Sequence, residues 1–410
     1  MSGGLVADPA QEPADRVARV GAAFRARYGR DPVLVWFGPG RVNLIGEHTD
    51  YTGGFVLPLA LPYGTAVAAA RVESSESGAL TSVTSSSQDG TVTFDAATVE
   101  PGGLDGWAAY VAGTAWALRT GFTRVDVPAL DLVVDSDVPT GAGLSSSAAL
   151  ECAVAGAVLA AAGRDDVLGD PMAVALAAKR AENDFVGAPT GYMDQMASVL
   201  GRDGHVLFID TRSLETDAVA FDLAGAGLAL LVVDSNAPHR HADGEYAARH
   251  DSLERATAEL GVEALREVGI PEMDAQLARL SDDELRARVR HVVTENERVL
   301  ETVRVLRAAA EGTGDIRAIG TLLTASHASM RDDFEITVPE VDVLVEAAVA
   351  AGAHGARMTG GGFGGCVIAL VEASAADAVA ASMARAAADA GHAPPTAYHA
   401  VAADGARRIG

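Results

Sequence analysis

The sequence predicts an α+β protein of two domains, and three observations support this. Segments with strand character dominate the first half of the chain, and helical segments dominate the second half. Strands and helices do not alternate regularly, which argues against a doubly wound parallel sheet. The length of 410 residues fits two or three domains. We expect the domains to span 1–215 and 216–410, with the boundary between residues 205 and 225.

The first half opens with Val17, Val20, Phe24 and Tyr28, whose helical spacing predicts an amphipathic helix. Apolar and β-branched runs separated by Ser/Gly-rich turns then predict strands at 33–37, 65–73, 80–85, 91–94 and 130–134. Ala-rich or apolar segments predict helices at 106–120, from about 148 to 163, and at 171–187. The second of these helices contains almost no charge, so we expect it to be buried.

The second half is predicted to be mainly helical. Apolar periodicity and frequent i,i+4 charge pairs predict helices at 242–260, 282–310, 315–331 and 338–351. Strands are expected at 228–234, 366–371 and near residue 397.

Composition excludes several classes of function. The formal net charge of −25 and the lack of a Lys/Arg-rich block argue against a nucleic-acid or anionic-membrane partner. The N-terminus has no basic, then apolar, signal-peptide pattern, which predicts a cytoplasmic location. Cys152 and Cys366 lie in apolar stretches, so we expect buried thiols rather than a disulfide or a zinc site.

Lys179 is the single lysine of the chain. A Walker A motif needs a lysine inside its glycine loop, and a protein kinase needs one on its third strand. Lys179 lies in an Ala-rich helical pattern instead, which excludes both. A phosphate ligand would have to be bound by backbone N–H groups, a helix N-terminus or a divalent metal.

Three segments have the composition of a ligand site. In residues 38–51, six polar side chains follow a glycine-flanked strand: Arg41, Asn43, Glu47, His48, Thr49 and Asp50. Carboxylates accept from hydroxyls, and Arg and His donate, so this segment suits a polyhydroxylated ligand. A solvated turn is the alternative.

The second segment, residues 139–147, joins a strand to the buried helix and contains two glycines and three serines. A glycine-rich turn at a helix N-terminus offers free N–H groups to phosphate. The alternatives are a tight turn with a serine N-cap, or a dinucleotide-binding fingerprint, which the absence of a βαβ pattern disfavours.

The third segment, residues 359–365, also has the GxGxxG spacing, but a strand follows it rather than a helix. Close backbone packing near a ligand is the functional interpretation, and a strand-entry turn is the structural one. Between these segments, Asp194 precedes an apolar helical pattern. A lone acidic residue in this position is usually an N-terminal cap or a solvated charge, so its position alone does not mark it as catalytic.

Together the segments resemble the galactokinase family of the GHMP small-molecule kinases. The motifs GPGRVNLIGEHTDY (38–51), PTGAGLSSSAALECA (139–153) and MTGGGFGGC (358–366) occur in the family's order. The resemblance runs from about residue 20 to the end of the chain. It implies the GHMP α+β fold, an active site in the interdomain cleft, and ATP-dependent phosphorylation of galactose at its C1 hydroxyl, the first committed step of galactose metabolism.

The resemblance also implies a role for each matching residue. Sugar hydroxyls would be bound by Glu47, His48, Thr49, Asp50, Gly191 and Tyr246. The ATP phosphates would lie on Gly141, Ala142, Gly143, Leu144, Ser145, Ser146 and Ser147. Mg²⁺ would be held by Ser147 and Glu182. Asp194 would be the base that faces the C1 hydroxyl, and Arg41 would keep Asp194 ionised and stabilise the transferred group.

Two positions depart from the family pattern. Thr190 stands where cysteine is common, and Tyr192 stands where a branched aliphatic residue is common, so we expect Tyr192 to add bulk beside Gly191. A kinase for N-acetylgalactosamine or arabinose therefore stays an alternative. So does a galactose-sensing regulatory paralogue, although the Ser147–Ala148 pair favours catalysis. No obligate protein partner is inferred.

Overall fold

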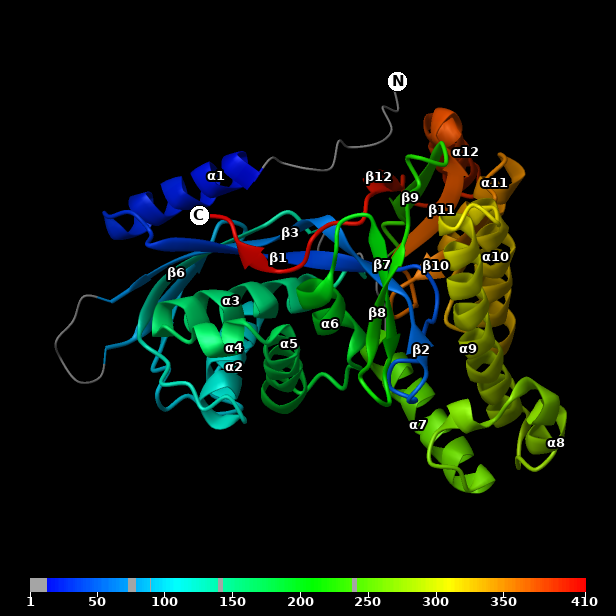
Figure 1. The fold of residues 1–410 in the computed structure, drawn as a ribbon, viewed down its shortest axis with the longest axis horizontal. Helices are drawn as coiled ribbons and strands as arrows, with labels where there is room; N and C mark the ends of the chain where they lie inside the picture. The colour runs from blue at the N-terminus through cyan, green and yellow to red at the C-terminus, as the bar shows by residue number, and fades with distance from the viewer. Residues whose placement is uncertain (1–12, 73–78, 89, 139–142, 238–241) are drawn as a thin grey trace.

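The computed structural model describes residues 13–72, 79–88, 90–138, 143–237 and 242–410. Within these ranges the chain forms three sheets and the helices that cover them (Figure 1). The combination of mainly antiparallel sheets with separate groups of helices confirms the predicted α+β class.

The six-stranded sheet carries the first half of the chain. Its order is β13-β1-β3-β6-β4-β5, and all neighbours are antiparallel except β4 and β6. The strands are β1 (Leu34–Asn43), β3 (Pro58–Arg71), β4 (Thr81–Ser85), β5 (Thr91–Phe94), β6 (Leu130–Ser136) and β13 (Arg407–Arg408). The helices of this half are α1 (Pro13–Tyr28), α2 (Trp107–Thr120), α3 (Ser146–Ala162), α4 (Asp165–Leu168), α5 (Pro171–Arg180) and α6 (Met193–Leu200).

Helices cover both faces of this sheet, because successive side chains along each strand point to opposite faces and both sets are apolar. Val35 and Ala66 pack with Phe24 of α1 on one face, whereas Leu34 and Val67 pack toward α2 and α3 on the other. Figure 1 shows α1 above the sheet and α2 to α5 below it. The charge-poor helix α3 is buried along most of its length, as the sequence predicts.

Strand β1 continues through the Gly-Pro-Gly sequence to Asn43 rather than ending at Phe37. Its pairing with β3 shifts between Pro39 and Arg41, which is a β-bulge. Bulges bend a strand and re-aim the side chains beside them. Gly38 must be glycine, because an added Cβ would lie 2.3 Å from the carbonyl oxygen of Ala149 in α3.

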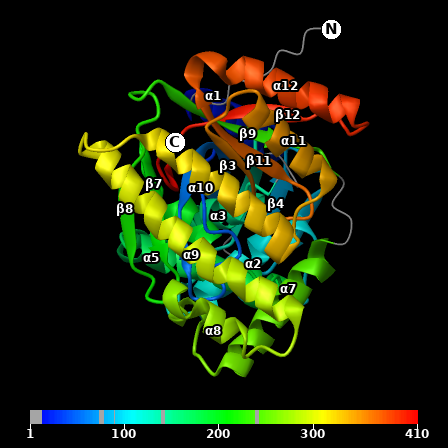
Figure 2. The same cartoon turned by 90° about the vertical axis from the view of Figure 1, so that its right-hand side faces the viewer.

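The second sheet belongs to the second half and has the antiparallel order β10-β11-β9-β12. Its strands are β9 (Leu228–Asp234), β10 (Gly355–Thr359), β11 (Cys366–Glu372) and β12 (Thr396–Ala400). Its helices are α7 (Ala242–Leu260), α8 (Met273–Leu277), α9 (Asp283–Ala310), α10 (Ile319–Ser329), α11 (Pro339–Ala350) and α12 (Ala376–Asp389). Figure 2 shows α9 and α10 side by side along the outer surface.

One apolar cluster joins the two halves. Val42 and Leu59 of the first half pack in the same cluster as Ile368 of β11 and Val299 of α9. The opposite face of the second sheet packs against α11 and α12 in a separate cluster. The C-terminal sheet is therefore sandwiched between its own helices and the end of the long β1–β3 pair.

The third sheet, β2-β7-β8, comprises β2 (Phe55–Val56), β7 (His205–Asp210) and β8 (Thr216–Ala220). The paired strands β7 and β8 flank the division expected after residue 215, and β13 returns from the C-terminal half to pair with β1. The exact division into domains stays a prediction.

Two further points concern the cysteines and the possibility of a membrane-spanning helix. Cys152 and Cys366 are both free and fully buried, as expected. In the part of the chain that the structure describes, no helix combines the length and apolar character needed to span a bilayer.

Two glycines inside helices give a matched test of this packing. An added Cβ at Gly156 of α3 would lie 2.1 Å from the Trp36 ring, whereas one at Gly21 of α1 would meet nothing within 4 Å. We expect Gly156→Ala to lower the free energy of unfolding by ~1–3 kcal/mol. Gly21→Ala should raise it by ~0.5–1 kcal/mol, because alanine has the better helix propensity. Chemical denaturation measures both, and equal effects of the two substitutions would contradict this packing.

Candidate active site

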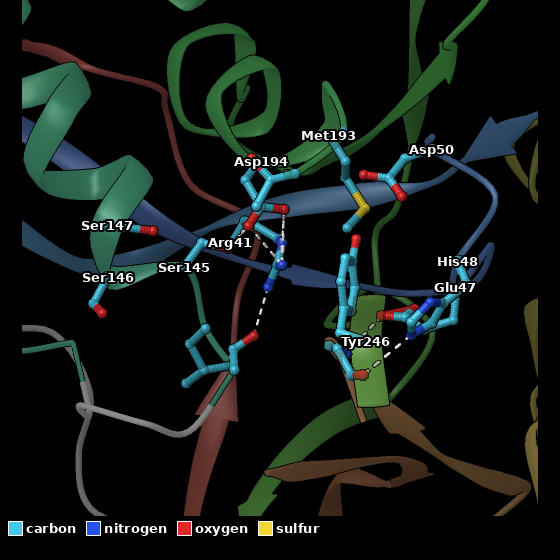
Figure 3. A pocket seen from close by; sticks show the side chains of 16 residues that line it. Arg41, Glu47, His48, Asp50, Ser145, Ser146, Ser147, Met193, Asp194 and Tyr246 are labelled. Carbon is cyan, nitrogen blue, oxygen red and sulfur yellow. Dashed lines mark hydrogen bonds and ion pairs between the residues drawn. The ribbon is translucent and has the colours of Figure 1, made fainter. Parts of the chain in front are cut away.

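A cavity of about 290 Å³ lies where the two halves meet. Figure 3 shows its side chains converging from β1, the loop after it, α3, α6 and α7. The residues that line it are Arg41, Glu47, His48, Asp50, Gly143, Leu144, Ser145, Ser146, Ser147, Thr190, Gly191, Met193, Asp194, Tyr246, Gly360 and Gly361. All three segments singled out in the sequence therefore contribute to one cavity.

Arg41 and Asp194 form a two-pronged ion pair at the centre of the cavity (Figure 3). Arg41 Nε donates to Asp194 Oδ1 at 2.8 Å, and Arg41 Nη2 donates to Oδ2 at 2.9 Å. The guanidinium also donates through Nη1 to the carbonyl oxygen of Gly143 at 2.6 Å. Arg41 thus ties the first turn of α6 to the glycine-rich loop in front of α3.

The described part of the second segment, residues 143–147, is arranged for an anion. Ser145 precedes α3 in a left-handed conformation with φ of 57°, and its side chain does not cap the helix. Its hydroxyl donates to Asp194 Oδ2 at 2.5 Å instead. The N–H groups of the first turn of α3 are therefore left to a ligand, at the positive end of the helix dipole. Gly141 and Ala142 lie outside the described residues.

The loop between β1 and β2, residues 44–54, is termed the signature loop below. His48 in this loop contacts two partners: Nε2 lies 3.1 Å from the carbonyl oxygen of Gly361, and Nδ1 lies 2.7 Å from the Tyr51 hydroxyl. Burial, with a smaller effect of His291, lowers the pKa of His48 to about 3, so the ring is neutral. A carbonyl only accepts, so Nε2 carries the proton and Nδ1 accepts from Tyr51.

Glu47 is fixed by two donors from the C-terminal half of the chain and one from its own half. Its Oε2 accepts from Arg357 Nη2 at 2.6 Å and from Asn43 Nδ2 at 2.5 Å. Its Oε1 accepts from the Gly360 N–H at 2.5 Å. A carboxylate offers about four acceptor positions, so one is left for a ligand in the cavity.

Asp50 and Gly191 are in close contact across the cavity wall. A Cβ on Gly191 would lie 1.9 Å from Asp50 Oδ2, which explains the glycine. Burial, followed by the charges of Asp194 and Glu47, raises the pKa of Asp50 to about 7. Asp50 therefore titrates near neutral pH rather than at its ordinary value.

Glu182 lies beside Ser147 in the π-helical turn Ala181–Val186. Its Oε2 accepts from Gln195 Nε2 at 2.7 Å and from the Thr190 hydroxyl at 2.8 Å. Burial and the charge of Asp194 raise the pKa of Glu182. Among the described residues, no Arg, Lys or His forms an ion pair with it. A buried carboxylate beside a hydroxyl, without a counter-charge, is a donor set that suits a hard cation such as Mg²⁺.

A second cavity of about 190 Å³ shares Ser146 and Ser147 with the first and extends along α2 and α3. Trp107 and Tyr110 of α2 line its aromatic side, and Gln88 contributes an amide. Indole and phenol rings offer flat apolar surfaces, which suit stacking of a planar base. The two cavities therefore meet at the N-terminus of α3.

Two residues expected beside the ligand lie away from the cavity. Thr49 is fully buried, and its hydroxyl lies 2.9 Å from the Gly46 carbonyl oxygen and 2.7 Å from that of Phe55, so it holds the signature loop together. Tyr192 does not line the cavity either, because its ring lies under the Lys179 ammonium at 4.4 Å. The expectation that Tyr192 narrows the pocket is wrong.

Sequence reasoning missed four other polar residues at this site. Arg357 and Glu295 hold the signature loop, while Glu151 and Gln195 lie behind Glu182. Of these, only Glu151 gave a signal in the sequence, as the lone charge in an apolar helix.

Comparison with known proteins identifies the family. The model of the galactokinase galactose-binding signature matches residues 22–71, and the GHMP kinase N-terminal and C-terminal models match 109–202 and 305–389. The galactokinase of Streptomyces coelicolor is 48% identical over 95% of this chain and 98% of its own length. This chain belongs to the galactokinase family.

Further relatives agree with this membership. The galactokinase of Mycobacterium tuberculosis is 50% identical over 90% of this chain and 97% of its own. The crystal structure of Lactococcus lactis galactokinase complexed with galactose superposes with a TM-score of 0.86 at 31% identity, covering 96% and 99% of the two chains. Methanococcus jannaschii mevalonate kinase, at 14% identity and a TM-score of 0.62, shares the fold, covering 90% and 98% of the two chains.

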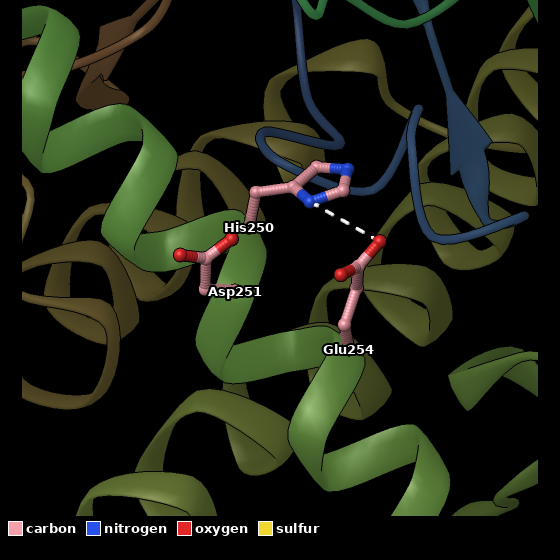
Figure 4. Close-up of side chains that lie close together, drawn as sticks. All are labelled: His250, Asp251 and Glu254. Atoms are coloured by element: carbon pink, nitrogen blue, oxygen red, sulfur yellow. Dashed lines mark ion pairs between the residues drawn. The ribbon is translucent and has the colours of Figure 1, made fainter.

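Figure 4 shows one further group of possible metal ligands, His250, Asp251 and Glu254 of α7. Both carboxylates are exposed, and His250 Nδ1 lies 3.6 Å from Glu254 Oε1. The His250 ring also stacks on Tyr51, with 5.1 Å between the ring centroids. This histidine therefore packs on the ring of Tyr51, whose hydroxyl donates to His48.

The raised pKa of Asp50 predicts how stability depends on pH. The folded protein holds the Asp50 proton up to about pH 7, whereas the unfolded chain releases it near the ordinary value of 3.8. The charge therefore destabilises the fold increasingly as the pH rises from about 4 to 7, and the effect is constant above that. The melting temperature of Asp50→Asn should exceed that of the wild type by a margin that grows across this window. A margin independent of pH would contradict the assignment.

Proposed function

We propose that this chain transfers the γ-phosphoryl group of ATP to the C1 hydroxyl of α-D-galactose, giving galactose 1-phosphate and ADP. The observation that carries the proposal is the Arg41–Asp194 pair, placed where the sugar-type cavity meets the loop in front of α3. Family membership supports the same reaction.

ATP fits the two connected cavities. The base would lie between Trp107 and Tyr110, and the phosphates would pass over Ser146 and Ser147 at the N-terminus of α3. Free backbone N–H groups and the helix dipole would replace the lysine that the chain lacks at this site. Arg41, the one cation among the described lining residues, would stabilise negative charge on the transferred group.

Galactose fits the polar half of the cavity of about 290 Å³. Asp50 and the free position of Glu47 accept from hydroxyls, and the Tyr246 hydroxyl can donate or accept. Gly191 leaves room for the sugar and for Asp50 at once. His48 and Thr49 support this group by holding the loop, since their polar atoms already have partners.

Asp194 would accept the proton of the C1 hydroxyl. Two N–H groups of Arg41 and the Ser145 hydroxyl occupy three of its acceptor positions and fix the carboxylate in one orientation. Asp194 lines the cavity, so its remaining acceptor position would orient the sugar hydroxyl toward the phosphate. Because phosphoryl transfer has a loose transition state, this positioning supplies most of the catalysis.

Ser147 and Glu182 would hold Mg²⁺, which when bound neutralises phosphate charge. The buried, unpaired carboxylate of Glu182 carries this proposal. Thr190 and Gln195 would orient Glu182 by donating to one of its oxygens. A cytoplasmic location and the absence of an obligate protein partner stay predictions from the sequence.

ADP release measured against a panel of sugars tests the function. Galactose and glucose differ only at C4, and a site built from hydrogen-bonding groups can reject a mispaired analogue by ~10⁴ in kcat/KM. We therefore expect galactose to be strongly preferred over glucose, arabinose and N-acetylgalactosamine. A preference for N-acetylgalactosamine would leave only the GHMP kinase chemistry. ATP and galactose binding without turnover would favour the regulatory alternative.

The role of Asp194 predicts the behaviour of Asp194→Asn. Asparagine has nearly the same shape but cannot take the proton, so kcat should fall by ~10²–10⁴. Galactose affinity, measured by calorimetry, should change little. The control is Asp203→Asn, an exposed carboxylate outside both cavities. Wild-type turnover in Asp194→Asn would show that another group takes the proton.

The role of Glu182 predicts opposite effects of Glu182→Gln on metal binding and on stability. Losing a metal ligand should weaken Mg²⁺-nucleotide binding by at least the ~10-fold that loss of a supporting partner typically costs. Without metal, the melting temperature should stay equal or rise, because a desolvated charge has been removed. Calorimetry measures the Mg²⁺-nucleotide affinity, and thermal melts measure the stability. A lower melting temperature with unchanged metal affinity would mean that Glu182 is structural.

A further inference from the structure

The underside of the signature loop rests on one face of helix α9. His291, Glu295 and Val299 follow one another at i, i+4 and i+8, so they line a single stripe of the helix. Each of them reaches the loop or lies within contact distance of it. An added Cβ at Gly46 would lie 2.9 Å from Val299 Cγ2, which shows how closely the loop backbone approaches the helix.

Glu295 makes the most direct connection between the two. Its Oε1 accepts from the backbone N–H of Gly46 at 2.9 Å and from that of Glu47 at 3.3 Å. His291 Nε2, from the same stripe, lies 3.1 Å from the carbonyl oxygen of Glu47. The N–H groups of Gly46 and Glu47 and the carbonyl oxygen of Glu47 are therefore held by side chains of α9, which belong to the other half of the molecule.

The Glu295 carboxylate is kept charged although it is fully buried. Arg298 Nε donates to its Oε2 at 2.7 Å, and the Ser326 hydroxyl donates to its Oε1 at 2.7 Å. Burial alone would raise the pKa of Glu295, but Arg298 and Arg357 hold that pKa below its ordinary value. Charge-assisted hydrogen bonds of this kind are about twice as strong as neutral ones.

We propose that Glu295 is a positioning residue for the sugar site, which sets the galactose affinity by holding the backbone of the signature loop at Gly46 and Glu47. Glu295 does not line the cavity, and among the described residues no hydrogen bond links it to Asp194 or to residues 143–145 in front of α3. It acts on the residues that follow in the loop, His48 and Asp50, which do line it. The proposal rests on the proposed galactokinase activity.

This position separates binding of the sugar from the chemical step. Arg41 and Asp194 are held by β1 and α6, together with each other and Ser145, so they keep their geometry when the loop moves. If the signature loop is loosened, the affinity for galactose falls, because part of the binding free energy is then used to order the loop. The affinity for ATP depends on other elements.

The decisive variant is Glu295→Asp, which keeps the charge but withdraws the carboxylate from the loop N–H groups by one methylene. We expect the KM for galactose to rise at least about tenfold, with kcat and the KM for ATP within about twofold of the wild type. The matched control is Glu297→Gln on the same helix, an ion-pair partner of Arg304 outside the stripe, which should change none of these constants.

A second control separates positioning from general packing. Ser326→Ala removes one donor to Glu295 Oε1 without touching the loop, so galactose KM should change far less than in Glu295→Asp. A structural role for Glu295 would lower the active fraction, and hence kcat, while the surviving molecules kept the wild-type KM for galactose. That outcome overturns the proposal, as does an equal rise of KM in Ser326→Ala.

Hydrogen exchange on the wild-type protein tests the proposal even if the variant does not fold. The amides of Gly46 and Glu47 donate to a buried carboxylate without any sugar present, so they should exchange slowly in the free protein and gain little protection from galactose. Fast exchange that only galactose slows would overturn the proposal. Absence of turnover with galactose, in contrast, would refute the proposed function and leave this measurement valid.

Discussion

The buried ion pair between Glu47 and Arg357 is the interaction on which the cavity depends. Both side chains are almost completely inaccessible, at 2% and 0% exposed, and their charged atoms are 2.6 Å apart. Arg357 also donates to the Leu44 carbonyl oxygen, so β10 fixes the signature loop at both its start and its acidic side chain. Removal of one partner of such a pair leaves an uncompensated charge and typically costs ~3–5 kcal/mol. Separation of the two halves at this point therefore costs free energy, so the cavity walls keep their relative positions.

Burial, reinforced by repulsion among carboxylates, governs the ionisation of the opposite wall. Burial comes first in raising the pKa of Asp50, Glu151 and Glu182, and each is raised further by a neighbouring carboxylate. Glu151 is fully buried, and its Oε1 has no hydrogen-bond partner among the described residues. The Arg41 guanidinium forms its ion pair with Asp194 rather than with any of these three carboxylates. A wall with several carboxylates that lack a cationic partner is favourable for a divalent cation. The molecule as a whole is strongly acidic and would repel free phosphate.

The sequence was sufficient for the fold class and for most of the cavity, because both depend on contiguous motifs. Glycine-rich turns and dense polar runs are visible without knowledge of tertiary contacts. The remaining features depend on contacts between distant segments. Ser145 resembles an N-cap in sequence, yet its hydroxyl binds Asp194. Glu295 is one of many charges in α9, and only the fold shows that it faces a loop almost 250 residues earlier. Tyr192 was misjudged because its neighbour Gly191 lines the cavity while its own ring turns toward Lys179.

The return of β13 to the first sheet has a consequence for how the protein is made. Val35 N–H donates to the Gly410 carbonyl oxygen at 2.9 Å, and Ile409 N–H donates to that of Val35 at 2.9 Å, so residues 407–410 cover the outer edge of β1. The ribosome releases those residues long after β1 itself. Until then the nascent N-terminal half presents an uncovered strand edge, the kind of surface on which unrelated chains pair and aggregate. The edge of β1 therefore stays uncovered for the time needed to synthesise the second half, and the stability of the finished protein does not shorten that interval.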